Sequence, residues 1–210
     1  EVFANFMAAK MVNPSFPEIN HDLNFLLRHY PSAYGVDRSE GANPIRQNLQ
    51  NLNEAGQMYG AIIYNKAPIM MRQLESMLGE EVFRSGIQEY LSTFGMKNAI
   101  WPDLIDILDK RTEIDLKRWS DVWVNTAGRP VFQWTEKEDQ QGLTVALGQV
   151  DMSGKGRSWP QGFRIKLFNP IRKDRKELLV VSADQPYEIK LDKSWKGLEL
   201  LANSNGMGYG

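Results

Sequence analysis

The hydrophobic period changes once along this 210-residue chain, near residues 128–130 (Gly-Arg-Pro). Before that point apolar residues recur about every 3.6 positions, which is typical of amphipathic helices. After it they alternate with polar residues, as they do in half-buried strands. The change predicts an α+β chain with two parts: an all-α part over residues 1–128 and a small antiparallel β-sandwich over residues 131–210.

Five segments of the first part carry the helical period: residues 22–30, 66–78, 80–91, 101–108 and 116–124. We expect the first helix to end at Tyr30, because Pro31 lacks the N–H that a helix interior needs. Asp115 is the expected N-cap of the last helix. Within that helix Trp119 and Trp123 share one face and are expected to be buried anchors.

Strand-like alternation marks the second part at five places: residues 143–147, 163–167, 178–181, 187–191 and 198–201. Turn-forming pairs separate these segments, for example Ser153-Gly154 and Gln185-Pro186. Their spacing is about that of strands in an all-β sandwich.

Composition excludes several function classes. The chain carries 25 basic and 26 acidic residues, so its net charge of −1 gives no reason to expect a nucleic-acid partner or an anionic membrane surface. No apolar run approaches the roughly 20 residues that span a bilayer. Without cysteine there are no disulfides or thiolate metal sites, and two histidines cannot form a His-rich zinc site. We expect His21 and His29 to be solvent-exposed beside a short helix.

The first nine residues, Glu-Val-Phe-Ala-Asn-Phe-Met-Ala-Ala, are apolar almost throughout and show no N-cap. They are predicted to be the middle of a buried helix in a larger domain. A carboxylate in such a segment needs a cation, a metal or a surface position. On physical grounds alone, exposure of Glu1 is favoured over metal ligation.

Tyr64 precedes the most suggestive local pattern, Asn65-Lys66-Ala67-Pro68. Proline is tolerated in the first turn of a helix, so the following helix is expected to start near Asn65, a good N-cap. Tyr64 would then lie at a helix N-terminus, where partial positive charge collects and a phenol can donate to an oxyanion. On spacing alone, an ordinary half-buried tyrosine bonded to a backbone carbonyl is the favoured alternative.

Taken in order, several segments resemble the M1 zinc aminopeptidases, a gluzincin family. Residues 1–4 (Glu-Val-Phe-Ala) resemble its Asn-Glu-Gly-Phe-Ala segment, and residues 62–67 resemble its Tyr-x-Lys-Gly segment. Residues 43–45 (Asn-Pro-Ile) resemble a His-Pro-Ile element, residues 78–91 the helix pair that follows, and residues 119–131 the end of the catalytic domain. Val2, Asn43 and Ala67-Pro68 depart from the family pattern.

The resemblance implies that residues 1–128 are the C-terminal part of a thermolysin-like catalytic domain and that residues 131–210 are the β-sandwich after it. It implies Glu1 as the third zinc ligand and Tyr64 as the group that binds the carbonyl oxygen in the transition state. A peptide is the implied substrate. The His-Glu-x-x-His motif occurs nowhere in the chain, so we expect these 210 residues alone to be inactive and not to hold zinc tightly.

A second hypothesis belongs to another class. The protein could be a noncatalytic helical-plus-sandwich interaction module that has lost the metal motif. The residues that precede Glu1 distinguish the two hypotheses. Compartment, oligomeric state and substrate preference stay open at this point.

Overall fold

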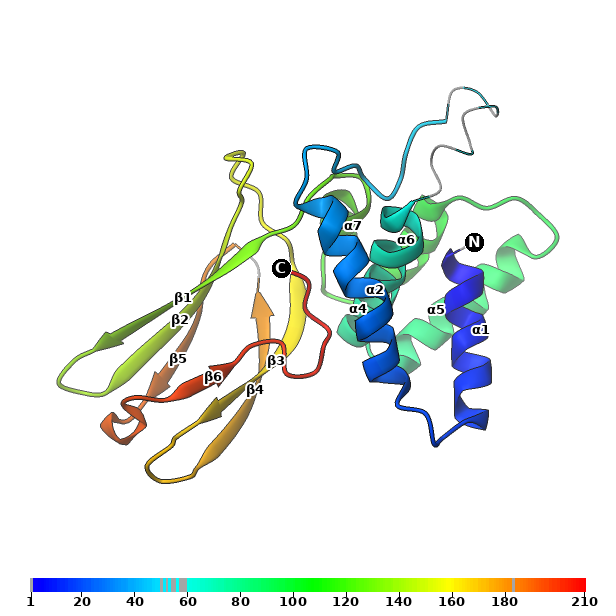
Figure 1. Cartoon of the computed structure of the whole chain (residues 1–210). Coiled ribbons are helices and arrows are strands. Elements are labelled where there is room, and N and C mark those ends of the chain that lie inside the picture. The colour runs from blue at the N-terminus through cyan, green and yellow to red at the C-terminus, as the bar shows by residue number, and fades with distance from the viewer. Residues whose placement is uncertain (1, 50, 52, 54–55, 57–59, 183) are drawn as a thin grey trace. The chain divides into compact units, whose positions relative to one another are not determined.

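The computed structural model describes residues 2–49, 51, 53, 56, 60–182 and 184–210. The chain divides into two compact units, Glu1–Gly128 and Arg129–Gly210. In the described residues, six α-helices come first and two three-stranded antiparallel sheets follow (Figure 1). The predicted α+β class, helical part first, is confirmed.

The helices of the first unit are α1 (Val2–Val12), α2 (His21–Asp37), α4 (Ala67–Leu78), α5 (Glu80–Phe94), α6 (Trp101–Asp109) and α7 (Leu116–Val124). The last four match the expected segments to within a few residues. Asp115 caps α7 as predicted, because its side chain accepts a hydrogen bond of 2.9 Å from the Arg118 N–H. Trp119 and Trp123 are completely buried, as expected of core anchors.

The helix predicted over residues 22–30 was expected to end at Tyr30, which is wrong, because α2 continues through Pro31 to Asp37. Asn20 caps its start and accepts from the Leu23 N–H. Beyond the proline, Ala33 and Asp37 are buried. Proline removes one helical hydrogen bond, but burial of the following turns keeps the segment helical.

The helix expected at the start of the chain is present as α1, but its expected burial is wrong for the described residues. Phe6 is the one buried residue of α1 among residues 2–12. Its ring packs edge-on against Phe83 of α5, with the ring centroids 5.9 Å apart. Further along α1, Met11 and Val12 are exposed. The ring of Phe3 also packs edge-on against Tyr90 of α5, with the centroids 6.1 Å apart. Aromatic contacts on one face therefore anchor a helix whose remaining residues are mostly exposed.

The second unit contains sheets of order β1-β2-β5 and β4-β3-β6. Their strands are β1 (Val131–Glu138), β2 (Leu143–Val150), β3 (Gln161–Phe168), β4 (Arg175–Ser182), β5 (Tyr187–Leu191) and β6 (Glu199–Leu201). Alternate residues of both sheets form one core, which includes Val145, Ile165 and Ile189. Across the two sheets the rings of Phe132 and Phe163 lie 5.0 Å apart. This inward-facing packing is that of a sandwich.

Strand β1 was not among the predicted strands. It lies at the edge of its sheet and pairs with β2 in the register Val131↔Val150 to Glu138↔Leu143. Its last four residues are exposed. An edge strand with such weak burial shows little alternation, which explains why no periodic signal marked it.

None of the helices in the described residues is long and apolar enough to cross a membrane.

Candidate active site

Tyr64 lies in a wide helical turn that leads directly into α4. Residues Ile62–Lys66 form a π-helical turn, closed by a hydrogen bond from the Ala67 N–H to the Ile62 carbonyl. The expected N-cap at Asn65 is therefore wrong: the residue before α4 is Lys66, which is itself helical and makes no side-chain cap. Pro68 does lie in the first turn of α4, but the chain before it is already helical. Such π turns are rare and occur often at functional sites.

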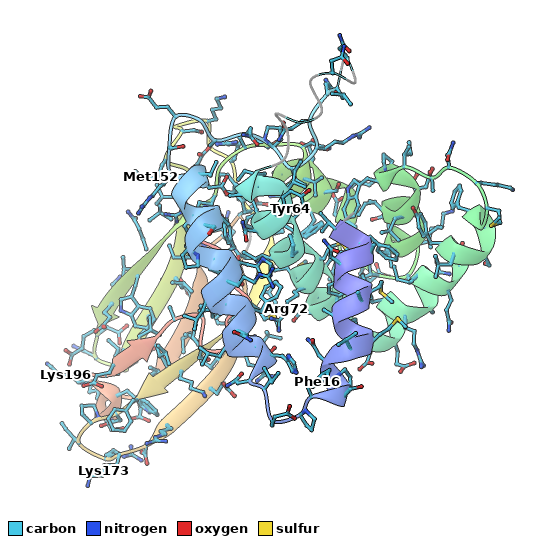
Figure 2. The ribbon with its side chains drawn as sticks, turned by 45° about the vertical axis from the view of Figure 1, so that its right-hand side comes forward. Phe16, Tyr64, Arg72, Met152, Lys173 and Lys196 are labelled. Carbon is cyan, nitrogen blue, oxygen red and sulfur yellow. The ribbon has the colours of Figure 1, made fainter. Side chains whose placement is uncertain are left out.

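A pocket of about 690 Å³ opens beside this turn. Figure 2 shows two of its residues, Tyr64 and Arg72, in the space between α2 and α1. Side chains from α1, α2, the π turn and α4 line this pocket. They include Asn5, Phe6 and Ala9 from α1, His21, Phe25 and His29 from α2, and Tyr64, Asn65 and Arg72 from the π turn and α4. The Tyr64 side chain keeps enough exposure, 37%, to meet a molecule in this pocket.

His29 is half-buried against Tyr64 and Asn65, so its predicted full exposure is wrong. Its Nδ1 lies 3.2 Å from the Asn65 Oδ1, and its ring is tilted against Phe25 with the centroids 4.3 Å apart. Burial, with the nearby Arg28 and Arg72 charges, lowers the pKa of His29 below 6.5, although hydrogen bonds to Asn65 and to the Tyr64 backbone oppose this. The neutral imidazole is the form that this environment favours at neutral pH.

His21 also lines the pocket, at the start of α2. Its Nε2 lies 2.9 Å from the Phe16 carbonyl oxygen. The two histidines thus share one pocket, although the sequence alone placed them on solvent. His21 and His29 are eight positions apart on one helix, which keeps them on nearly the same side of it. That spacing was the signal in the sequence for a shared environment.

Charged side chains on the pocket wall are paired across elements. The Arg72 guanidinium of α4 bonds Asp22 of α2 at 2.6 Å and lies 4.4 Å from the centre of the Phe25 ring. On the other side Lys10 of α1 pairs with Glu75 of α4. These pairs connect α1 and α2 to α4 beside the pocket.

The π turn is anchored from behind by a buried ion pair that sequence reasoning missed. Lys66 Nζ lies 2.7 Å from an Asp37 carboxylate oxygen, and neither side chain is exposed. The same ammonium donates to the Gly128 carbonyl at 2.8 Å and lies 6.0 Å from the Trp123 ring centre. A buried lysine needs a partner, but Lys66 follows the polar Asn65 and its place in the sequence did not mark it as buried.

Glu1, the predicted metal ligand, lies outside the described residues. Asn5 and Ala9, which follow it by four and eight positions, line the pocket. The described part of the chain contains no group of three His, Asp or Glu side chains close enough to hold a metal ion. A catalytic zinc site needs three protein ligands, so the described residues do not supply such a site by themselves.

The model of the Peptidase family M1 domain matches residues 1–123 of the chain. Among known proteins, the chain is 31% identical over 161 residues to the puromycin-sensitive aminopeptidase of Caenorhabditis elegans, covering 77% of the chain and 17% of that protein. A probable aminopeptidase 1 of Sulfurisphaera tokodaii is 31% identical over 132 residues, 63% of the chain and 17% of the relative.

A longer match extends through both units. The tricorn protease-interacting factor F2 of Thermoplasma volcanium is 26% identical over 206 residues, which is 98% of the chain and 25% of the relative. The chain therefore spans between 17% and 25% of the length of these three relatives.

Proposed function

This chain belongs to peptidase family M1, and from that membership we propose that it is a section of a zinc metalloaminopeptidase that removes N-terminal residues from peptides. Residues 1–128 would be the C-terminal part of the catalytic domain, and residues 131–210 the β-sandwich domain that follows. The small fraction of each relative that the chain covers supports a longer protein. Peptides are the proposed partners.

The observation that carries the proposal is the place of Tyr64. Its side chain lies at a pocket of about 690 Å³, on a π turn that ends at the buried Lys66–Asp37 ion pair. We assign the phenol the role of hydrogen-bond donor to the oxygen that becomes negative when the peptide carbonyl is attacked. A donor held before the reaction begins stabilises that charge without reorganisation.

Glu1 is the proposed zinc ligand of this chain in the longer protein. The resemblance of residues 1–4 to the zinc-ligand segment of the family supports this assignment. A zinc ion would supply Lewis-acid activation of the carbonyl. The other ligands and the general base would come from a His-Glu-x-x-His segment that these 210 residues do not contain.

The test compares the full-length protein with the 210-residue chain on aminoacyl anilides. We expect the full-length protein to release N-terminal residues, to lose that activity to a chelator and to regain it with zinc. The chain alone should show neither hydrolysis nor stoichiometric zinc. A full-length protein that lacks His-Glu-x-x-His before Glu1 and hydrolyses none of these substrates would support the noncatalytic interaction module instead.

A further inference from the structure

The charged side chains that line the pocket beside Tyr64 do not balance. Three of them are cations, Lys10, Arg28 and Arg72, and two are anions, Asp22 and Glu75. Lys10 pairs with Glu75, and Arg72 bonds Asp22 at 2.6 Å. Arg28 forms no ion pair within the part of the chain that the structure describes. Its positive charge on the pocket wall is therefore left without a partner among those residues.

The two arginines of the pocket differ in what they can still bind. The Arg72 guanidinium is engaged on two sides, by the Asp22 carboxylate and by the face of the Phe25 ring, whose centre is 4.4 Å away. Arg28 is exposed on α2 and lines the same pocket. A guanidinium has five N–H donors in a planar fork. Those of Arg28 are the ones that a molecule in the pocket can use.

The surroundings of Arg28 favour an anionic ligand. Burial first, and then the charges of Arg28 and Arg72, lower the pKa of the adjacent His29 below 6.5, so the field in the pocket disfavours a further positive charge. The amide side chains of Asn5 and Asn13, from α1 and the residue directly after it, also line the pocket. An amide can donate to a carboxylate oxygen without adding charge.

A peptide offers this pocket groups of both signs. The free α-amino group of an aminopeptidase substrate has a pKa of about 7.7–8.0, so it is mostly protonated at pH 7. The unpaired Arg28 charge repels that ammonium group. A carboxylate is attracted instead, and a guanidinium can bind it through two parallel hydrogen bonds. The pocket therefore suits the part of the peptide that follows the scissile bond.

We propose that Arg28 is a specificity-determining residue, whose guanidinium binds a carboxylate in the part of the peptide after the scissile bond. That carboxylate is the acidic side chain of the second residue or the C-terminus of a dipeptide, since both present the same planar anion. The inference rests on the proposed aminopeptidase function of the longer protein.

The test compares two matched pairs of dipeptides with the zinc-loaded full-length protein. The first pair is alanyl-glutamate and alanyl-glutamine, both amidated at the C-terminus, and it isolates the acidic side chain. The second is alanyl-alanine with a free or an amidated C-terminus. In at least one pair we expect kcat/KM to be about three- to five-fold higher for the carboxylate peptide, as for a partly exposed charge pair. Arg28→Met should reduce that ratio to below about 1.5-fold.

A second readout does not depend on turnover. After a chelator has removed the metal, the dissociation constants of the same peptides are measured by calorimetry. The preference for the carboxylate member should appear there too, and it should fall as salt is added, because ions screen an exposed charge.

Three further variants separate charge recognition from folding. Arg28→Lys keeps the charge and should retain about half or more of the preference. Arg28→Glu should reverse it, so that the amide of alanyl-lysine becomes a better substrate than that of alanyl-glutamate. Arg38→Met removes another exposed arginine, just after α2 and outside the pocket lining, and should leave both ratios unchanged. The same ratios in Arg28→Met as in the parent protein, or no preference in either pair, would overturn the inference.

The two proposals fail differently. If the full-length protein hydrolyses all four dipeptides without a preference that depends on Arg28, the specificity role alone is wrong. If it hydrolyses no peptide, the proposed aminopeptidase function is wrong and the role of Arg28 in selecting a substrate falls with it.

Discussion

Lys66 and Asp37 form an ion pair that is sealed from solvent, with Nζ and the carboxylate oxygen 2.7 Å apart. Asp37 ends α2, and Lys66 ends the π turn that carries Tyr64. The pair therefore joins the two segments that form one side of the candidate site.

Removing one partner of this pair should strongly destabilise the helical unit. Lys66→Met leaves a buried carboxylate without its ammonium, and we expect a loss of about 3–5 kcal/mol in the free energy of unfolding. The double variant Lys66→Met/Asp37→Leu should lose less than the sum of its single variants. Urea unfolding followed by helical circular dichroism measures this. As a control, Lys10→Met breaks a more exposed pair and should cost under about 1 kcal/mol. Equal losses of unfolding free energy in Lys66→Met and Lys10→Met would contradict the predicted importance of the buried pair.

Tyr64→Phe in the full-length protein should lower kcat by about 10²–10³-fold, since the proposed oxyanion donor is lost. The fold should be unaffected, because the phenol lies at the open pocket. Steady-state kinetics on an aminoacyl anilide give the result. Tyr187→Phe, in β5 of the other unit, is the matched control and should leave kcat as it was. An unchanged kcat in the Tyr64 variant would remove it from the mechanism.

His29 should make folding stability depend on pH. Because burial first, and then Arg28 and Arg72, lower the pKa of His29 in the folded protein below 6.5, the unfolded chain binds its proton more readily. The contribution of the neutral His29 to the free energy of unfolding is fully present above pH 6.5. It is lost as the pH falls through 6.5 towards the lowered pKa. NMR titration of the imidazole should give a midpoint below 6.5. Replacing the residue by glutamine should flatten the stability curve in that window; an unchanged slope would argue against it.

Gly86 and Gly35 should respond in opposite directions to alanine. A Cβ at Gly86 of α5 would overlap the Leu108 side chain of α6, so overpacking should cost about 1–3 kcal/mol. At Gly35, inside α2, a Cβ meets no atom within 4 Å, and alanine should stabilise the helix by about 0.5–1 kcal/mol. Thermal unfolding of both variants measures this: an unchanged or raised Tm for Gly86→Ala would refute the overpacking, and a lowered Tm for Gly35→Ala would refute the helix stabilisation.

Asp151 should stabilise the loop after β2. Burial raises the pKa of Asp151, but hydrogen bonds from Arg157 and Ser153 outweigh it and hold that pKa well below its usual value. The stability that the Asp151 carboxylate contributes is present above about pH 4 and is lost as the pH falls below that value. Asp151→Asn should cost about 1–3 kcal/mol near neutral pH. Asp174→Asn, which breaks the exposed pair with Arg172, should cost under about 1 kcal/mol; a similar loss in both would contradict the role.

Periodicity predicted the elements that bury one face, and it failed where tertiary contacts decide. Helix α7 and strand β5 follow directly from their patterns and neighbouring turn residues. Pro31 looked like a helix end, yet burial of Ala33 carries α2 past it. Local rules made Asn65 an N-cap, but it lies within a π turn and its side chain contacts His29, which is 36 residues away in the chain. Such distant partners leave no periodic trace in a single sequence.

The bond from Lys66 to the Gly128 carbonyl has a mechanical consequence. Gly128 is the last residue of the first unit and has a positive φ of 94° that glycine adopts without strain. Tension on the chain beyond this residue would be carried into the buried ammonium, two residues from Tyr64. In a single-molecule pulling experiment, force applied at residue 129 would therefore load the π turn at residues 62–66 before it could unravel α7.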